Sequence, residues 1–218
     1  MPTGEQPGIL GQSAIIAGFI DTLALDRPPL LVGHSLGGAV ALGVATHRPS
    51  SVAGLALLAP MTQPPGSMPV PVANAIESNP GGRALFANLL GTPISRAAYG
   101  LRWGKIFAPD PVPADFGTRG GGALGDRPVA FNAALVELAS ADVDLAAIVS
   151  RYAKLTVPVA LLYGRDDQVI APSIDGEQAV AAIPGATLEM TGGGHMLPVA
   201  HPQASAAFVR RFAKHVLQ

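Results

Sequence analysis

The chain has 218 residues, 49% of them hydrophobic and 13% charged, which is enough for one domain with a sizeable core. Its formal net charge is -1, which argues against nucleic acid or an anionic membrane as the main partner. It has no cysteine, which excludes disulfides, thiolate catalysis and a cysteine zinc site. The N-terminus shows no secretory pattern, and the apolar runs fall far short of the ~20 residues of a membrane span. We therefore expect a soluble, cytoplasmic protein.

The first quarter of the chain alternates helical and strand patterns. Residues 12–25 predict a helix whose apolar residues share one face. That face consists of Ile15, Ile16, Phe19, Ile20 and Leu23. Residues 30–32 indicate a short buried strand, residues 38–47 a helix, and residues 52–58 a strand that is apolar almost throughout. Continuous apolar strands are typical of a parallel sheet covered on both faces.

Residues 61–150 have a different character, with clustered prolines at the start and no long strand pattern. Helical patterns occur at residues 72–77, 83–90 and 129–138. We interpret this segment as a helical cap inserted after a sheet strand, with a core formed by residues 1–60 and 151–218. The alternative is a poorly ordered segment, given its glycine and proline content.

The strand and helix alternation resumes after residue 150. Strands are expected at residues 157–163 and 186–190, and helices at 173–183 and 202–216. In the last helix we expect Ala206, Phe208, Val209 and Phe212 to face inward. The alternation of strands and helices along the whole chain predicts the α/β class, with a mostly parallel sheet flanked by helices.

The most informative stretch is Gly33-His34-Ser35-Leu36-Gly37-Gly38, between the first strand and the second helix. A serine between two glycines at a strand-to-helix turn is the G-x-S-x-G pattern of a nucleophile elbow. Such a turn is strained, so we expect a Cβ at Gly33 or Gly37 to crowd it. The start of the next helix favours negative charge beside Ser35. The alternative is a glycine-rich turn with a chance serine.

With this elbow the chain resembles the α/β-hydrolase family, and the resemblance extends over almost the whole chain. In that family the nucleophile, the acid and the histidine follow in that order. The acid stands after a strand in a G-x-x-D pattern, which here begins at Gly164 and selects Asp167 over Asp166. The carboxyl end of a parallel strand is where catalytic groups are expected.

The family's histidine stands in a Gly-Gly-His loop after a later strand, which points to His195. The resemblance thus implies a triad in which Ser35 attacks, His195 moves the proton and Asp167 orients the imidazole. The Leu36 N–H is the expected oxyanion donor. No carboxylate follows the second strand, which reinforces the choice of Asp167.

Other residues receive lesser roles. We expect His34 and Met196 to line the substrate site, and we interpret His47, His201 and His215 as ordinary surface or core residues. The triad needs no metal or organic cofactor, and no ligand cluster has metal spacing. The expected partner is a small-molecule substrate. Apolar residues of the predicted cap, among them Leu85, Leu89, Trp103 and Phe107, favour a nonpolar one.

Only 34 residues precede Ser35, whereas the family has several strands and a His-Gly loop there. That loop supplies the second oxyanion N–H, and losing one donor costs on the order of 10²–10³ in kcat. The missing strands would leave an apolar edge on the first strand. We hypothesise that the natural chain starts upstream of Met1. For a chain that starts at Met1, we expect a homodimer through this edge or a loss of activity.

The leading functional hypothesis is a serine hydrolase that cleaves a carboxylic ester through an acyl-enzyme. A C–C bond hydrolase, a thioesterase, a lactonase and a cofactor-free haloperoxidase could use the same triad. Ser35 at the elbow, where relatives of the epoxide hydrolase and haloalkane dehalogenase type carry Asp, favours acyl transfer. A different class is a non-catalytic binding protein or an inactive fragment that keeps the triad but lacks the oxyanion loop.

Overall fold

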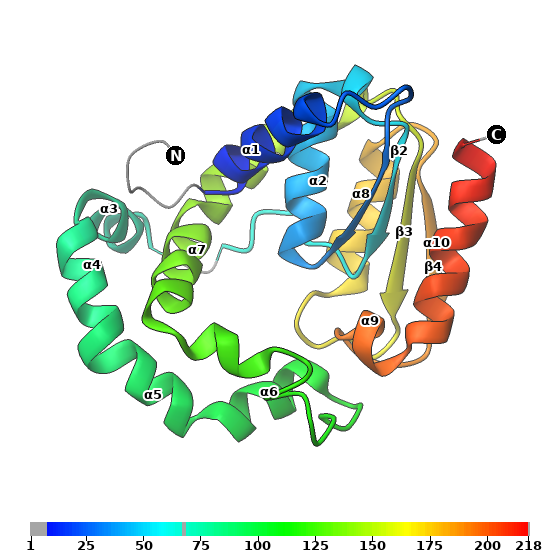
Figure 1. The fold of residues 1–218 in the computed structure, drawn as a ribbon. Coiled ribbons are helices and arrows are strands. Elements are labelled where there is room, and N and C mark those ends of the chain that lie inside the picture. The colour runs from blue at the N-terminus through cyan, green and yellow to red at the C-terminus, as the bar shows by residue number, and fades with distance from the viewer. Residues whose placement is uncertain (1–7, 67–68, 218) are drawn as a thin grey trace.

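A computed structural model describes residues 8–66 and 69–217 of the chain (Figure 1). The described residues form one sheet of four strands in the order β1-β2-β3-β4, and every neighbouring pair is parallel. The strands are β1 (Leu30–His34), β2 (Gly54–Leu58), β3 (Val159–Gly164) and β4 (Thr187–Thr191). The mostly parallel α/β sheet expected from the sequence is confirmed.

Helices cover both faces of this sheet. The helices of this part are α1 (Ile9–Thr22), α2 (Leu36–His47), η1 (Pro49–Ser51), η4 (Tyr152–Lys154), η5 (Pro172–Gly176), α8 (Glu177–Ala182), α9 (Leu197–Ala200) and α10 (Pro202–Val216). Helices α2 and α8 pack on one face, and α9 and α10 on the other (Figure 1). Along β2, Leu55 and Leu57 join the first core cluster, while Ala56 and Leu58 join the second. Burial on both faces explains why this strand is apolar throughout.

The closing helix α10 begins and ends where the sequence pattern predicts. Phe208 is buried on the sheet, and Val209 and Phe212 pack partly buried beside it. Ala206 is only half-buried. The three larger residues of this set therefore face the sheet, as the sequence predicts.

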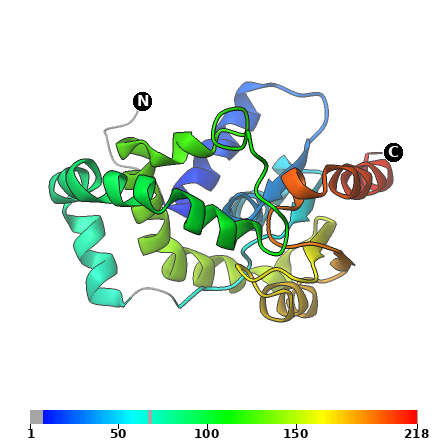
Figure 2. The ribbon, with the colours of Figure 1, turned by 90° about the horizontal axis from the view of Figure 1, so that it is seen from below.

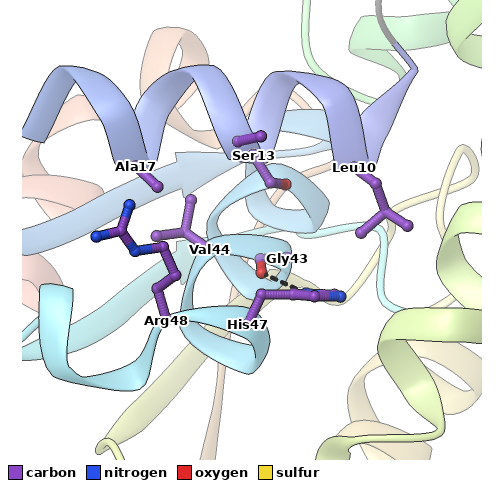
Figure 3. Close-up of a pocket in the computed structure, with 8 residues that line it drawn as sticks. Leu10, Ser13, Ala17, Gly43, Val44, His47 and Arg48 are labelled. Atoms are coloured by element: carbon purple, nitrogen blue, oxygen red, sulfur yellow. Dashed lines mark hydrogen bonds between the residues drawn. The ribbon is translucent and has the colours of Figure 1, made fainter.

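Helix α1 turns its small residues toward α2. Ser13 and Ala17 are buried, and a Cβ on Gly43 would lie 2.2 Å from the Ser13 hydroxyl oxygen (Figure 3). The apolar face predicted for this helix is instead largely open to solvent, with Ile15 58% and Phe19 57% exposed. The close approach of the two helix backbones needs small side chains, so the larger residues point away from α2.

The contact between α1 and α2 also encloses a small pocket of about 170 Å³ (Figure 3). Its polar groups already have partners: Ser13 Oγ lies 2.8 Å and 2.9 Å from the carbonyl oxygens of Ile9 and Val40, and His47 Nδ1 lies 3.0 Å from Gly43 O. It lies along α2 toward His47, away from the helix start at Leu36. We therefore give this pocket no part in the chemistry.

Strand β1 lies at the edge of the described sheet, because within residues 8–66 and 69–217 it pairs with β2 alone. Val32 on this strand is 52% exposed, and Leu30 and Leu31 are only partly buried. The strand expected at residues 30–32 is therefore present, but its predicted burial is wrong because its outer side has no neighbouring strand in the described residues. Together with Leu31, Phe19 and Leu23, Val32 lines an apolar groove of about 490 Å³ between α1 and the free side of β1. Below we call this region the open side of β1.

Residues 70–149, the inserted segment, are mainly helical and connect β2 to β3. Its elements are α3 (Val70–Ser78), α4 (Pro80–Phe86), η2 (Ala87–Gly91), α5 (Thr92–Ala97), α6 (Tyr99–Phe107), η3 (Gly122–Asp126) and α7 (Pro128–Val149). Helices α3 to α6 form an arc beside the sheet, and the chain that follows α6 reaches α9 (Figures 1 and 2). Helix α7 returns along α1, and its Leu145 and Ile148 belong to the sheet's core. The division into a core and a cap of residues 61–150 stays a prediction. Helix α7 contacts other helices of the inserted segment, and it also packs against α1 and the sheet's core.

The apolar residues of the inserted segment lie in two environments. The ring of Phe116 packs edge-on against Trp103 and Phe107, with centroids 4.7 Å and 4.8 Å away. Leu85 and Leu89 are instead 61% and 63% exposed.

Over residues 8–66 and 69–217, no helix is both long and apolar enough to cross a bilayer.

Candidate active site

The turn between β1 and α2 carries Ser35 in a strained conformation. Its φ of 53° and ψ of -123° lie in a region that non-glycine residues seldom adopt. Two backbone hydrogen bonds hold it there: the Ser35 N–H donates to Leu58 O at 3.1 Å, and the Met61 N–H donates to Ser35 O at 3.0 Å. The end of β2 therefore fixes the turn that projects the serine.

The turn is too tightly packed for a side chain at two glycine positions. One of these is a position that the sequence analysis did not select. A Cβ on Gly33 would lie 2.5 Å from Gly37 O, as the elbow pattern predicts. A Cβ on Gly37 would meet no atom within 4 Å, so the predicted crowding at this position is wrong. The crowded residue is Gly38, whose Cβ would lie 2.4 Å from Pro60 Cβ. Gly37 faces the open side of β1, where it lines the apolar groove.

Three side chains from three strand ends meet at this turn. His195 Nε2 lies 2.9 Å from Ser35 Oγ, and His195 Nδ1 lies 2.9 Å from Asp167 Oδ2. The side chains of His195 and Asp167 are 4% and 0% exposed. The structure thus brings together the three residues that the sequence analysis selected.

Backbone N–H groups hold the second carboxylate oxygen of Asp167. Asp167 Oδ1 accepts the N–H groups of Val169 at 2.8 Å and Ile170 at 2.9 Å. These bonds leave Oδ2 directed at His195. The neighbouring Asp166 uses its backbone, whose N–H donates to Gly193 O at 3.1 Å. A serine, an imidazole and a buried carboxylate in this series can transfer a proton from the hydroxyl to the imidazole.

His34 contacts the backbone of the histidine loop. Its Nε2 donates to His195 O at 2.9 Å, and the two imidazole rings lie 5.0 Å apart. Burial lowers the pKa of His34, and the hydrogen bond to His195 only partly opposes this shift. A neutral imidazole with its proton on Nε2 fits that contact. Its predicted role in substrate binding stays a prediction, as does that of the half-buried Met196.

Leu36 is the first residue of α2. The N–H groups of the first helical turn have no acceptor within the helix. The Leu36 N–H therefore fits the expected oxyanion donor, a role that stays a prediction.

A model of the alpha/beta hydrolase family matches residues 7–208. The chain belongs to the alpha/beta hydrolase family. This membership supports a hydrolase in general, without specifying the substrate.

Solved structures share the hydrolase fold at low sequence identity. An alpha/beta hydrolase fold protein from Burkholderia ambifaria superposes with a TM-score of 0.73 and 22% identity, covering 96% of this chain and 74% of that one. The enol-lactonase from Burkholderia xenovorans LB400 gives 0.70 and 19%, covering 98% and 75%. A thermophilic esterase from Thermogutta terrifontis gives 0.63 and 20%, covering 98% and 74%. At these identities the likeness shows the fold alone.

A local match links the chain to a curated relative. Lipase LipV of Mycobacterium tuberculosis is 46% identical over 55 residues, which is 25% of this chain and 21% of that lipase. The chain therefore matches about a fifth of the length of this relative.

A buried carboxylate that the sequence analysis missed holds the segment after β2. Asp175 Oδ1 accepts the N–H groups of Thr62 at 2.8 Å and Gln63 at 3.1 Å, and the Tyr152 hydroxyl donates to Thr62 O at 2.8 Å. Burial raises the pKa of Asp175, although the Thr62 and Gln63 N–H groups oppose the shift. This network fixes the segment that holds Ser35 through Met61.

A second missed carboxylate lies where the inserted segment meets the histidine loop. Asp110 contacts both Gly194 and His201. His201, interpreted from sequence as an ordinary residue, thus has a specific partner. No sequence spacing relates residue 110 to residues 194 and 201, because only the path of the inserted segment brings them together.

In the part of the chain that the structure describes, no group of three or more His, Cys, Asp or Glu residues could hold a metal ion.

Proposed function

We propose that this alpha/beta hydrolase cleaves a carboxylic ester through an acyl-enzyme on Ser35. The observation that carries the proposal is the continuous series of 2.9 Å contacts from Ser35 through His195 to Asp167. The strained φ of Ser35 supports it, because strain of this kind clusters at reactive residues.

The proposed reaction has two halves. Ser35 Oγ attacks the ester carbonyl while His195 Nε2 takes the hydroxyl proton, and the tetrahedral intermediate carries its negative charge beside the Leu36 N–H. The C–O bond to the alcohol then breaks, and His195 gives its proton to the departing alcohol. A water molecule, deprotonated by His195, attacks the acyl-enzyme, and the carboxylic acid leaves as the proton returns to Ser35. Asp167 stabilises the imidazolium in both halves.

A pocket of mixed polarity lies next to the loops that hold the triad. It measures about 280 Å³, and its lining combines Met61, Ile170 and Ile174 with the polar Gln63 and Asp175. Met61 donates its N–H to Ser35 O and Ile170 donates its N–H to Asp167, but Ser35, Asp167 and His195 do not line the pocket themselves. The length of the acyl chain is therefore left to the substrate experiment.

A lactone is a cyclic ester and would use the same steps, with the alcohol remaining attached to the acyl group. The local likeness to a lipase and the fold shared with an esterase and an enol-lactonase are consistent with ester chemistry in this broad sense. Thioesters are open to the same attack. Cleavage of the bond between the carbonyl carbon and the ester oxygen is therefore the proposed chemistry, and the hydrolysis experiment distinguishes a linear ester from a lactone.

The experiment is steady-state hydrolysis of p-nitrophenyl acetate, butyrate and octanoate and of a simple lactone by the wild-type chain and Ser35→Ala. We expect the wild type to hydrolyse at least one of these esters, and Ser35→Ala to lose about 10⁴- to 10⁶-fold in kcat. Equal rates in both proteins would contradict the proposal. A folded wild type that binds these esters without hydrolysing them would instead favour a non-catalytic binding protein.

A further inference from the structure

Asp110 connects the inserted segment to the loop that carries the catalytic histidine. It stands three residues after the end of α6 at Phe107. Its Oδ2 accepts the Gly194 N–H at 2.9 Å, and its Oδ1 lies 2.9 Å from His201 Nε2. Gly194 directly precedes His195, and His201 stands at the boundary between α9 and α10. One carboxylate therefore holds the histidine loop at two points on either side of His195.

The backbone packing at this contact is too close for side chains. A Cβ on Gly194 would lie 2.1 Å from Ala108 O. Gly193 has a φ of 99°, and its Cβ would lie 2.1 Å from His201 Nε2 and 3.0 Å from Asp110 Oδ2. The two glycines before His195 are therefore needed for the approach of the inserted segment as well as for the turn itself.

The opposite side of the loop is held by the acid loop. Gly193 O accepts the Asp166 N–H at 3.1 Å, and a Cβ on Gly164 would lie 2.2 Å from Gly193 O. The histidine loop thus lies between the end of β3 on one side and Asp110 on the other. Loss of either contact frees one side of the loop.

The Asp110 contact is buried on the side of the histidine loop. Gly194 is buried, while the side chains of Asp110 and His201 are 16% and 32% exposed. Removing the carboxylate therefore leaves the buried Gly194 N–H without its acceptor. The backbone next to His195 would shift to satisfy that group.

We infer that Asp110 is a positioning residue, which holds Gly194 so that the His195 imidazole stays in line between Ser35 and Asp167. The inference rests on the proposed function, because it assigns Asp110 a role in that reaction. Asp110 acts through the backbone of the histidine loop. Its effect should fall on kcat, since a displacement of about 1 Å in a reacting group can cost on the order of 10²-fold in rate.

The experiment compares Asp110→Ala and Asp110→Asn with the wild type, using p-nitrophenyl butyrate. We expect Asp110→Ala to lower kcat about 10- to 100-fold with KM changed less than about twofold. Asp110→Asn should recover kcat to within about threefold, because an amide oxygen can accept the Gly194 N–H and the amide NH₂ can donate to a neutral His201. The matched control is Asp115→Ala, since Asp115 lies in the same loop and its side chain is 55% exposed.

A second readout is independent of turnover. The proton on His195 Nδ1, bonded to Asp167, gives a low-field NMR resonance that His195→Ala identifies by its loss. We expect this resonance to be sharp in the wild type and Asp110→Asn, and broadened or shifted in Asp110→Ala. A wild type that shows the resonance but hydrolyses no ester would refute the proposed function, while the resonance in Asp110→Ala would still test the positioning role.

Two results would overturn the inference. One is an Asp110→Ala protein that melts at a lower temperature yet keeps the wild-type kcat and resonance, which would make the contact structural only. The other is an Asp110→Asn protein as impaired as Asp110→Ala. If Asp110→Ala does not fold, His201→Ala removes one of the two contacts, and we expect it to lower kcat by about three- to tenfold; a wild-type kcat in that variant would also count against the inference.

Discussion

The two sides of β1 differ sharply. On the side of β2, the strand is fully paired, a Cβ at Gly38 would overlap Pro60, and Ser35 is held by the end of β2. On the open side, Val32 is half-exposed and borders an apolar groove of about 490 Å³. The contacts that hold the triad lie on the paired side, because Ser35 is bonded to the end of β2 and its two partners follow β3 and β4.

The largest expected effect is at the centre of the paired side. His195→Ala should lower kcat for a p-nitrophenyl ester by about 10⁴- to 10⁶-fold, because Ser35 loses the base that accepts its proton. The measurement is steady-state turnover. His47→Ala, at the exposed C-terminal end of α2, is the matched control and should keep the wild-type rate. A similar loss in both variants would show that the effect is not specific to the triad.

Gly37 and Gly38 lie in the first turn of α2, one toward the open side of β1 and one toward Pro60. Gly38→Ala should lower the free energy of unfolding by about 1–3 kcal/mol, because its Cβ would overlap the rigid ring of Pro60. Gly37→Ala should be neutral or raise that free energy by up to about 1 kcal/mol, since it meets open space and alanine favours the helix. Urea denaturation checks both values. Equal destabilisation would mean that the open side of β1 is covered in solution.

The Asp175 network on the paired side has a pH signature. Burial raises the pKa of Asp175 above its ordinary value of 3.8, so the folded chain binds this proton more tightly than the unfolded chain. The contribution of Asp175 to the free energy of unfolding therefore falls as pH rises from 3.8 through the raised pKa. Asp175→Asn keeps an oxygen for the Thr62 and Gln63 N–H groups and should lack this fall.

Denaturation of both proteins from about pH 3 to pH 7 measures the difference in that slope. Asp175→Ala serves as the control for the hydrogen bonds, and should cost about 1–3 kcal/mol because two buried N–H groups lose their acceptor. Parallel pH curves for the wild type and Asp175→Asn would refute the raised pKa.

The smallest expected effect is on the open side. Val32→Ala should change the free energy of unfolding by less than about 0.5 kcal/mol, because this side chain is half-exposed. Val159→Ala, the matched change at a buried position of β3, should cost about 1–3 kcal/mol. A large loss at Val32 would show that something packs on the open side in the folded protein.

The sequence was informative wherever function depends on local pattern. The continuous apolar strands, the bounds of α10 and the elbow motif all follow from residues close together in the chain. The choice of Asp167 over Asp166 came from a motif spacing, and only the former points its side chain at His195 in the structure.

The sequence failed where packing partners are distant. The apolar face of α1 lies outward because Ser13 and Gly43, 30 residues apart, let the two helices approach closely. Gly37 is uncrowded because it lines the groove on the open side of β1. Asp110 carries no recognisable pattern, and its role depends on a contact with Gly194 across 84 positions of the chain.

Labelling with a fluorophosphonate, which reacts preferentially with activated serine hydroxyls, tests most directly whether the triad works. Mass spectrometry should locate the adduct on Ser35 in the wild type, and His195→Ala should abolish it. No adduct on the folded wild-type chain, or an adduct on another serine, would contradict the claim that Ser35, His195 and Asp167 form a working triad.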